Sequence, residues 1–251
     1  MCGIAGWINI PPSTLAPLEK MLDLIRHRGP DETKTYSDKN FAAGMVRLSI
    51  NGLSNGSQPL WSFSGKIALF FNGEIYNSPK LRNELERQGI RFQSDSDGEV
   101  LSHLFDVEGP KAFSKLDGMF AAALWNRESE MLTLVRDIPG EKPLYYGNHP
   151  SGGTVFASEL KAFAAIPGMN FTLNRQSIRD FPTFLWVPEP DTIFGEIKSL
   201  PRGHYLETSS TMKPRIVSYK EDTLSPLFAS EEEAIHEIRK TCDESIDARL
   251  L

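Results

Sequence analysis

The chain has 251 residues, of which 40% are hydrophobic and 24% are charged. These proportions are typical of a folded globular protein and exclude an intrinsically disordered chain. The length suits one large domain, or one domain with part of another. The formal net charge of −6 argues against non-specific binding to nucleic acid or to an anionic membrane, because both functions need a basic face.

Cysteine and histidine are sparse. The two cysteines, Cys2 and Cys242, are far apart and follow no secretory signal, so we expect no disulfide framework and a reducing, cytoplasmic location. No stretch approaches the roughly 18 apolar residues that a membrane span requires. The five histidines are scattered without the spacing of a metal site, so no bound metal is expected.

The predicted elements begin with a short apolar strand at residues 3–9. A helix is expected over residues 14–28, where apolar side chains recur at steps of three and four and Gly29-Pro30 follow as a stop signal. Further strands are expected at residues 41–48, 66–72, 119–126, 131–136, 143–147 and 154–157. Further helices are expected at residues 79–88, 98–107, 109–115 and 159–165.

Most of these strands are almost continuously apolar, as in Ile67–Phe71, which is typical of strands covered on both faces. Turn-forming residues at 127–130 and 149–153 separate neighbouring strands, so hairpins and antiparallel pairing are expected. Two sheets with helices on the outside are the stable layered arrangement for such elements. The sequence therefore predicts an α+β fold with two packed antiparallel sheets.

The character of the chain changes near residue 206. Residues 208–228 are rich in serine, threonine and proline and are predicted to form a linker. Residues 229–251 are predicted to form one amphipathic helix, with Ser230 as its N-cap and Cys242 packed on its apolar face. A single apolar face needs a partner, so we expect this helix to be the first of a second domain.

Cys2 is the strongest candidate for chemistry. An initiator methionine before a small residue is normally removed, which would leave a thiol and a free α-amine on one residue. These groups titrate near pH ~8.5 and ~7.7–8.0, so the amine can act as the base for the thiol, as in N-terminal nucleophile hydrolases. The alternative is that Cys2 is a small buried residue at the start of a strand.

A thiolate that attacks an amide forms a tetrahedral oxyanion, which needs hydrogen-bond donors. Asn72 and the backbone N–H of Gly73 offer a side-chain amide and a backbone donor at the end of a predicted strand. The alternative for this pair, which precedes Glu74, is a hairpin turn, because Asn-Gly is a strong hairpin signal. On spacing alone the turn is favoured.

An amino-acid substrate needs a cation for its α-carboxylate and an anion for its α-ammonium group. Arg47 can supply a bidentate guanidinium, and Asp97 can supply a carboxylate. Taken singly, each has a simpler explanation as a surface charge or, for Asp97, as a helix cap. No phosphate-binding loop is expected either, because Ser151–Gly153 leads into a strand and is predicted to be a turn.

Six motifs in one order resemble the N-terminal glutaminase domain of glutamine-hydrolysing asparagine synthetases, a branch of the class II glutamine amidotransferases. They are Met1–Gly6, Arg26–Asp31, Arg47–Ile50, Asn72–Asn77, Ser96–Val100 and Arg136–Tyr146. The Arg-His-Arg-Gly-Pro-Asp form of the second motif points to the asparagine-synthetase branch. The resemblance covers residues 2–206, and the amidotransferase domain is expected to span residues 2–207.

The resemblance implies a four-layer α/β/β/α sandwich of the N-terminal nucleophile hydrolase type. It implies that Cys2 attacks the side-chain amide of L-glutamine and forms a thioester, with Asn72 and the Gly73 N–H as the oxyanion hole. Arg47 would hold the α-carboxylate of glutamine and Asp97 its α-ammonium group. Further contacts with the ligand are implied for Leu48, Ile50, Asn51 and Glu74.

The resemblance also implies that the released ammonia serves asparagine synthesis in a longer enzyme. No cofactor or metal is expected for the glutaminase step, whereas ATP and Mg²⁺ are expected for a synthetase domain. That domain would continue after the helix at 229–251, or would act in trans. A homodimer is a further expectation, and neither nucleic acid nor a membrane is an expected partner.

Two alternatives stay open. One is a non-catalytic module that binds glutamine or a partner chain, and the other is an amidotransferase with an acceptor other than aspartate. Two departures from the family pattern bear on the site. Asn51-Gly52 stand where the family usually has an apolar residue and aspartate, which is expected to loosen that wall. Residues 138–141 read Ile-Pro-Gly-Glu, where the family usually has an aromatic residue or leucine before the glycine and an apolar residue after it.

Overall fold

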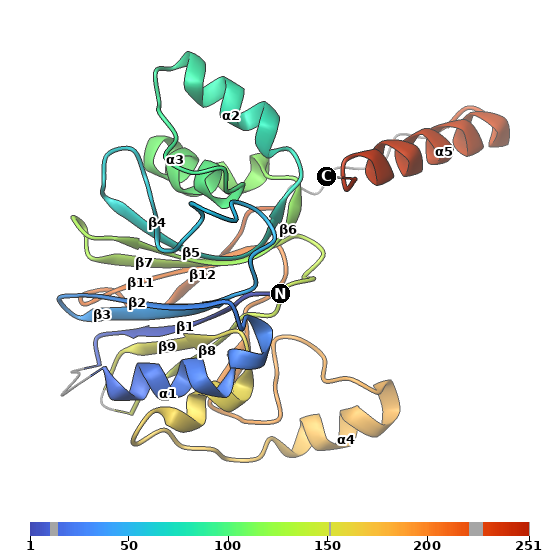
Figure 1. The fold of residues 1–251 in the computed structure, drawn as a ribbon. Coiled ribbons are helices and arrows are strands. Elements are labelled where there is room, and N and C mark those ends of the chain that lie inside the picture. Colours follow the sequence, from blue (N-terminus) through green and yellow to red (C-terminus); the bar gives the residue numbers. More distant parts are fainter. Residues whose placement is uncertain (11–14, 151, 221–227, 251) are drawn as a thin grey trace.

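A computed structural model describes residues 1–10, 15–150, 152–220 and 228–250. Two six-stranded sheets stack face to face, and every pairing between neighbouring strands is antiparallel (Figure 1). In spatial order, the first sheet contains β10 (Ile197–Ser199), β8 (Tyr145–Asn148), β9 (Thr154–Ala157), β1 (Gly3–Ile8), β3 (Phe41–Arg47) and β2 (Glu32–Asp38). The second contains β12 (Arg215–Ser218), β11 (His204–Ser209), β7 (Met131–Arg136), β6 (Gly118–Asn126), β5 (Ile67–Ile75) and β4 (Leu60–Trp61).

The central core lies between the two sheets. Ile4 on β1 and Phe41 on β3 pack against Phe70 on β5 and Trp125 on β6. The rings of Phe41 and Trp125 stack with centroids 4.6 Å apart, which joins the sheets directly. Alternate residues of β5 point to opposite faces, so Phe71 packs in the outer core while Phe70 packs in the central one. The continuous apolar runs in the sequence therefore reflect strands that are buried on both faces.

Helices cover the outer faces of both sheets. The first sheet is covered by α1 (Ala16–Leu24) and by two 3₁₀ helices, η1 (Arg26–Arg28) and η3 (Leu160–Ala165). The second is covered by α2 (Ser78–Arg87), α3 (Gly98–Glu108) and the 3₁₀ helix η2 (Gly109–Lys115). This arrangement confirms the predicted α/β/β/α sandwich, and Figure 1 shows its four layers.

The boundary predicted at residue 207 is too early, because β11 runs to Ser209 and β12 pairs with it. The serine- and threonine-rich stretch between these strands forms their turn, in which the N–H of Ser209 donates to the carbonyl of Met212. Tyr219, just beyond β12, is buried and donates its hydroxyl to the carbonyl of Arg136 at 2.7 Å. The amidotransferase domain therefore includes part of the predicted linker, of which residues 221–227 lie outside the described residues.

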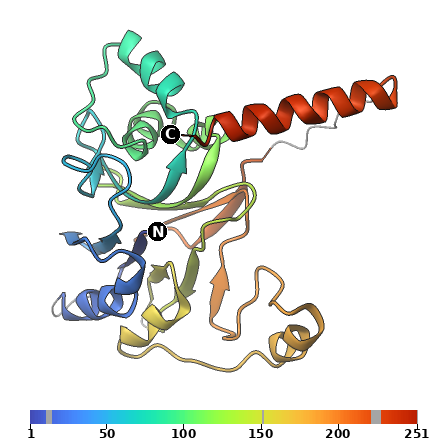
Figure 2. The ribbon, with the colours of Figure 1, turned by 45° about the vertical axis from the view of Figure 1, so that its right-hand side comes forward.

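Two helices project from the sandwich, α4 (Arg175–Phe184) and α5 (Glu231–Asp247) (Figures 1 and 2). Helix α5 forms where the amphipathic pattern predicts it, with the hydroxyl of Ser230 accepting the N–H of Glu233 at 3.1 Å. Its apolar stripe is exposed, and so is Cys242. Among the described residues, no helix combines the length and the apolar character needed to cross a membrane.

Candidate active site

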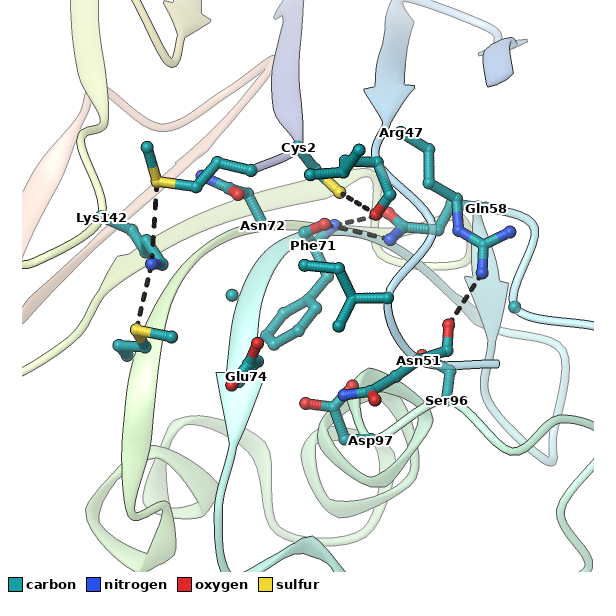
Figure 3. A pocket seen from close by; sticks show the side chains of 16 residues that line it. Cys2, Arg47, Asn51, Gln58, Phe71, Asn72, Glu74, Ser96, Asp97 and Lys142 are labelled. Atoms are coloured by element: carbon teal, nitrogen blue, oxygen red, sulfur yellow. Dashed lines mark hydrogen bonds between the residues drawn. The ribbon is translucent and has the colours of Figure 1, made fainter. Parts of the chain in front are cut away.

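A cavity of about 240 Å³ opens at one edge of the sandwich, where β1 begins and β3 ends beside β5 (Figure 3). Three strands, β3, β5 and β6, and four segments, which precede β1, follow β3, precede α3 and precede β8, bring distant motifs together here. All the residues that the sequence proposed for the site line this cavity: Cys2, Arg47, Leu48, Ile50, Asn51, Asn72, Gly73, Glu74 and Asp97. Their individual roles stay predictions, but their placement in one cavity is an observation.

Cys2 lies immediately before β1, and its thiol donates to the carbonyl of Leu48 at 3.6 Å. Burial raises the pKa of the Cys2 thiol, although the chain-terminal ammonium and the guanidinium groups of Arg47 and Arg28 oppose the shift. A thiol with a raised pKa is mostly protonated at neutral pH, so a nucleophile at this position needs a base. Cys2 is therefore partly buried, as a packed residue would be, and it also lines the cavity, as a nucleophile must.

Arg28 fixes the backbone of the candidate nucleophile, a contact that sequence reasoning did not find. Its Nε donates to the carbonyl of Cys2 at 2.9 Å, and its Nη1 pairs with Glu159 at 3.1 Å. Glu159 also lies 2.8 Å from His27. The Arg26–Asp31 motif thus contacts Cys2 through Arg28, which lies in η1 and hydrogen-bonds the Cys2 carbonyl.

Asn72 lies inside β5, not in a turn, so the hairpin favoured by the Asn-Gly pair is wrong. The strand continues to Ile75 because β6 pairs with it along its whole length, from Ile67 opposite Asn126 to Ile75 opposite Gly118. This long-range pairing overrides the local turn preference.

The side chain of Asn72 is only 1% exposed, and its Nδ2 has no hydrogen-bond partner among the described residues. Figure 3 shows this side chain beside Cys2 at the cavity wall. A buried N–H without a partner costs about 1–3 kcal/mol, so such groups are rare and call for an explanation. The bare amide has the chemistry that an oxyanion hole needs.

Gly73 lies opposite Phe120 of β6. Phe120 directs both of its backbone polar groups to Asp137, accepting from its N–H at 2.8 Å and donating to its carboxylate at 2.9 Å. Opposed residues of an antiparallel pair either bond each other or both point away, so the N–H of Gly73 points away from β6. A Cβ at Gly73 would lie 2.2 Å from the carbonyl of Met119, which leaves room only for glycine.

On the edge of β5 that faces away from β6, side chains hydrogen-bond the backbone of Phe71 and of Ile75, the residues two positions before and after Gly73. Gln58 uses its side-chain amide to donate to the carbonyl of Phe71 at 3.0 Å and to accept its N–H at 2.7 Å. Asp97 accepts the N–H of Ile75 at 2.7 Å. Because the backbone groups of alternate residues point the same way, the N–H of Gly73 faces the cavity between these two side chains.

Two carboxylates, Glu74 and Asp97, line the opposite part of the cavity. Burial raises the pKa of Asp97, and the negative charge of Glu74 adds to the shift, while the N–H of Ile75 opposes it. Two neighbouring carboxylates repel each other until a cation binds between them. This end of the cavity therefore suits an ammonium group.

Arg47 is 6% exposed, so it is not the surface charge that one interpretation of the sequence proposed. Its Nη2 donates to the carbonyls of Asn51 and Gly52 at 2.9 and 2.7 Å, and its Nη1 lies 3.6 Å from Glu32. Gly52 adopts a φ of 58°, in the left-handed region that favours glycine. The expected loosening at Asn51-Gly52 is thus offset by hydrogen bonds from Arg47, whose role toward a carboxylate stays a prediction.

The segment that carries Asp97 rests on a buried polar cluster that the sequence did not reveal. The carboxylate of Glu99 accepts the N–H groups of Gln93 and Ser94 at 2.7 Å and lies 3.2 Å from Nε2 of His103. Burial alone would raise the pKa of Glu99, but the adjacent imidazole of His103 and hydrogen bonds from Ser94 and Gln93 outweigh it and lower the pKa to about 2. Within the described parts of the chain, no cluster of three His, Cys, Asp or Glu side chains could hold a metal.

A family model described as "Glutamine amidotransferase domain" matches residues 1–220. The chain is 32% identical to asparagine synthetase [glutamine-hydrolyzing] 1 of Bacillus subtilis, covering 100% of this chain and 40% of that one. It is 36% identical to asparagine synthetase B [glutamine-hydrolyzing] of Escherichia coli, covering 79% of this chain and 34% of that one.

The fold has counterparts among solved structures. Glutamine phosphoribosylpyrophosphate amidotransferase from B. subtilis aligns with a TM-score of 0.61 and 22% identity, over 88% of this chain and 49% of that one. A structure described as the allosteric regulatory enzyme of purine biosynthesis aligns with a TM-score of 0.64 over 88% of this chain and 50% of that one. The family match covers the sandwich and every motif of the cavity, and the chain therefore belongs to the family of class II glutamine amidotransferase domains.

Proposed function

We propose that this chain hydrolyses the side-chain amide of L-glutamine through a thioester on Cys2. The observation that carries the proposal is the Nδ2 of Asn72, which has no partner among the described residues, in the cavity that Cys2 also lines, with the N–H of Gly73 facing the same cavity. A tetrahedral oxyanion would supply the acceptor that both donors lack. The carboxylates of Glu74 and Asp97 support an ammonium group at the other end, as an α-amino acid requires.

The proposed reaction has two stages. The α-amine of processed Cys2 takes the thiol proton, and the thiolate attacks the amide carbon to form a C–S bond and an oxyanion. The same amine then returns the proton to the leaving nitrogen, so that ammonia departs and a glutamyl thioester remains. In the second stage the amine takes a proton from water, whose oxygen attacks the thioester carbon. The C–S bond then breaks, the amine returns the proton to the departing sulfur, and glutamate and the free thiol are released.

The wider role is also a proposal, because the chain spans about 40% of the length of the first relative it matches. By analogy with the names of those relatives, the ammonia would serve asparagine synthesis by a synthetase domain in cis or in trans, which would use ATP and Mg²⁺. Helix α5 is proposed as the first element of that domain. An acceptor other than aspartate, a homodimer and a cytoplasmic location stay predictions.

The direct test is glutamate release from glutamine by the chain without Met1. Cys2→Ala is expected to abolish release, whereas Cys242→Ala removes the other, exposed thiol and is expected to leave the rate unchanged. Equal release by the Cys2 variant and the parent chain would contradict the proposal.

One observation favours a non-catalytic alternative. The side chain of Met1 lines the cavity, and in a chain that keeps Met1 the nitrogen of Cys2 is an amide that cannot act as a base. Such a chain would bind glutamine without hydrolysing it. The mass of the intact protein separates the two cases, and a mass that includes Met1 together with calorimetric glutamine binding would favour the alternative.

A further inference from the structure

Lys142 is a buried cation that the proposed reaction does not yet use. Its side chain is 7% exposed and lines the same cavity as Cys2. The hydrogen-bond partners of its Nζ within the described part of the chain are two sulfur atoms, Met119 Sδ at 3.0 Å and Met1 Sδ at 3.8 Å. Among the described residues no carboxylate lies within ion-pair distance of it. A buried ammonium group without an anionic partner is costly, so its retention calls for an explanation.

The surrounding loop holds the backbone of Lys142 firmly. The carboxylate of Asp137 accepts its N–H at 3.1 Å and those of Gly140 and Glu141 at 2.5 and 2.8 Å. The Nε of Arg136 donates to the carbonyl of Lys142 at 2.8 Å. The Arg136–Tyr146 motif, to which sequence reasoning gave no task, therefore fixes this lysine at the cavity wall.

The ammonium group faces the position that Met1 occupies. Since Met1 Sδ is only a few covalent bonds from the backbone nitrogen of Cys2, removal of Met1 leaves a free α-amine and Lys142 on the same small cavity. Figure 3 shows Lys142 and Cys2 on either side of Asn72. Two amines that share one poorly solvated cavity cannot both carry a proton at low cost.

A lysine side chain is ordinarily more basic than an α-amine. We propose that Lys142 is a positioning residue for the glutaminase reaction, whose positive charge keeps the α-amine of Cys2 unprotonated and so available as the base. The inference rests on the proposed function, because it concerns the base of that reaction.

Other charged groups also face the α-amine. Arg28 contacts the carbonyl of Cys2 and is paired with Glu159, and Arg47 is engaged with loop carbonyls. The carboxylates Glu74 and Asp97 also line the cavity and favour a protonated amine. Lys142 is the cation of this set that lacks both an anionic partner and a carbonyl partner among the described residues.

The test is the pH dependence of kcat/KM for glutamate release by chains without Met1. Lys142→Met keeps the length and removes the charge, and we expect the acidic limb to move up by about one pH unit, with about ten-fold lower kcat/KM below the limb. Activity is expected to recover at alkaline pH. Lys142→Arg retains the charge and is expected to keep the parent profile. Lys66→Met, at a partly exposed lysine outside the cavity that is paired with Glu128, is the matched control for net charge.

An acidic limb that does not move in Lys142→Met would overturn the inference, as would a change in KM alone. If Lys142→Met does not fold, the ¹⁵N signal of the α-amine in the parent chain decides instead, with a pKa below the ordinary range expected and an ordinary or higher pKa contradicting the proposal. A parent chain without glutaminase activity would instead refute the proposed function.

Discussion

Two buried polar side chains of this protein differ in how their hydrogen-bonding groups are satisfied. The amide of Asn72 has an Nδ2 without a partner among the described residues. The carboxylate of Glu99 accepts backbone N–H groups of Gln93 and Ser94 and lies beside His103. Asn72 faces the cavity, whereas Glu99 lies behind the segment that carries Asp97.

This difference in hydrogen bonding indicates different roles. The Asn72 amide is available to a ligand, whereas the Glu99 carboxylate stabilises the fold. A buried donor without a partner lowers stability, so removal of the Asn72 amide should cost activity and not folding. A fully bonded buried carboxylate does the opposite, because its removal leaves several donors without an acceptor.

The largest effect is expected for Asn72→Ala. Loss of one oxyanion donor should lower kcat by about 10²–10³-fold, with the free energy of unfolding unchanged or slightly raised. Steady-state kinetics and urea denaturation measure both. Asn126→Ala is the control, because the Asn126 side chain accepts two turn N–H groups, from Glu128 and Ser129. It should lose about 1 kcal/mol of stability and keep its activity.

A smaller effect, on stability, is expected for Glu99→Gln. The substitution places an NH₂ group where the carboxylate accepts hydrogen bonds and should lower the free energy of unfolding by about 2–3 kcal/mol in urea titrations at pH 7. An unchanged midpoint would show that the cluster does not support the segment that carries Asp97.

The contribution of Glu99 should also depend on pH. Its folded pKa of about 2 is below the value of 4.5 expected for the unfolded chain. The stabilisation is therefore complete above about pH 4.5 and is lost as the pH falls toward 2. The difference in unfolding free energy between the parent and Glu99→Gln should shrink over that range, and a constant difference would refute the assignment.

The smallest effect is expected for Gln58→Met, which leaves the backbone groups of Phe71 without their side-chain partner. Because Phe71 directly precedes Asn72, kcat should fall by about ten-fold, equivalent to about 1.4 kcal/mol, with KM unchanged. Gln88→Met, at an exposed position, is the matched control. An equal loss in both variants would argue against a positioning role for Gln58.

The layers could be predicted from local signals in the sequence, whereas the cavity residues were identified through six motifs whose order resembles a known family. Apolar runs define strands that are buried on both faces, and the motifs fall where β1 begins and β3 and β5 end, at one edge of the sandwich. The exposed edge strand β2 was missed because Glu32–Asp38 is mostly polar and pairs on one side only. Helix α4 was missed as well, and Pro182 interrupts its helical pattern.

What the sequence could not supply are contacts between residues far apart in the chain. The hydrogen bond from Arg28 to Cys2 and the approach of Lys142 to the N-terminus have no local signature. The turn predicted at Asn72-Gly73 failed for the same reason, because pairing with β6 decides the conformation there. Asn72 itself was identified as a candidate, but its unpartnered amide became visible only in the structure.

The central claim is that the processed Cys2 thiol attacks a glutamine side chain. A diazo-ketone analogue of glutamine tests it on the chain without Met1, followed by peptide mass spectrometry. The account predicts one adduct on the N-terminal cysteine peptide, with loss of nitrogen, and protection by glutamine. The exposed Cys242 is an internal control in the same molecule. An unmodified Cys2, or labelling confined to Cys242, would contradict the account.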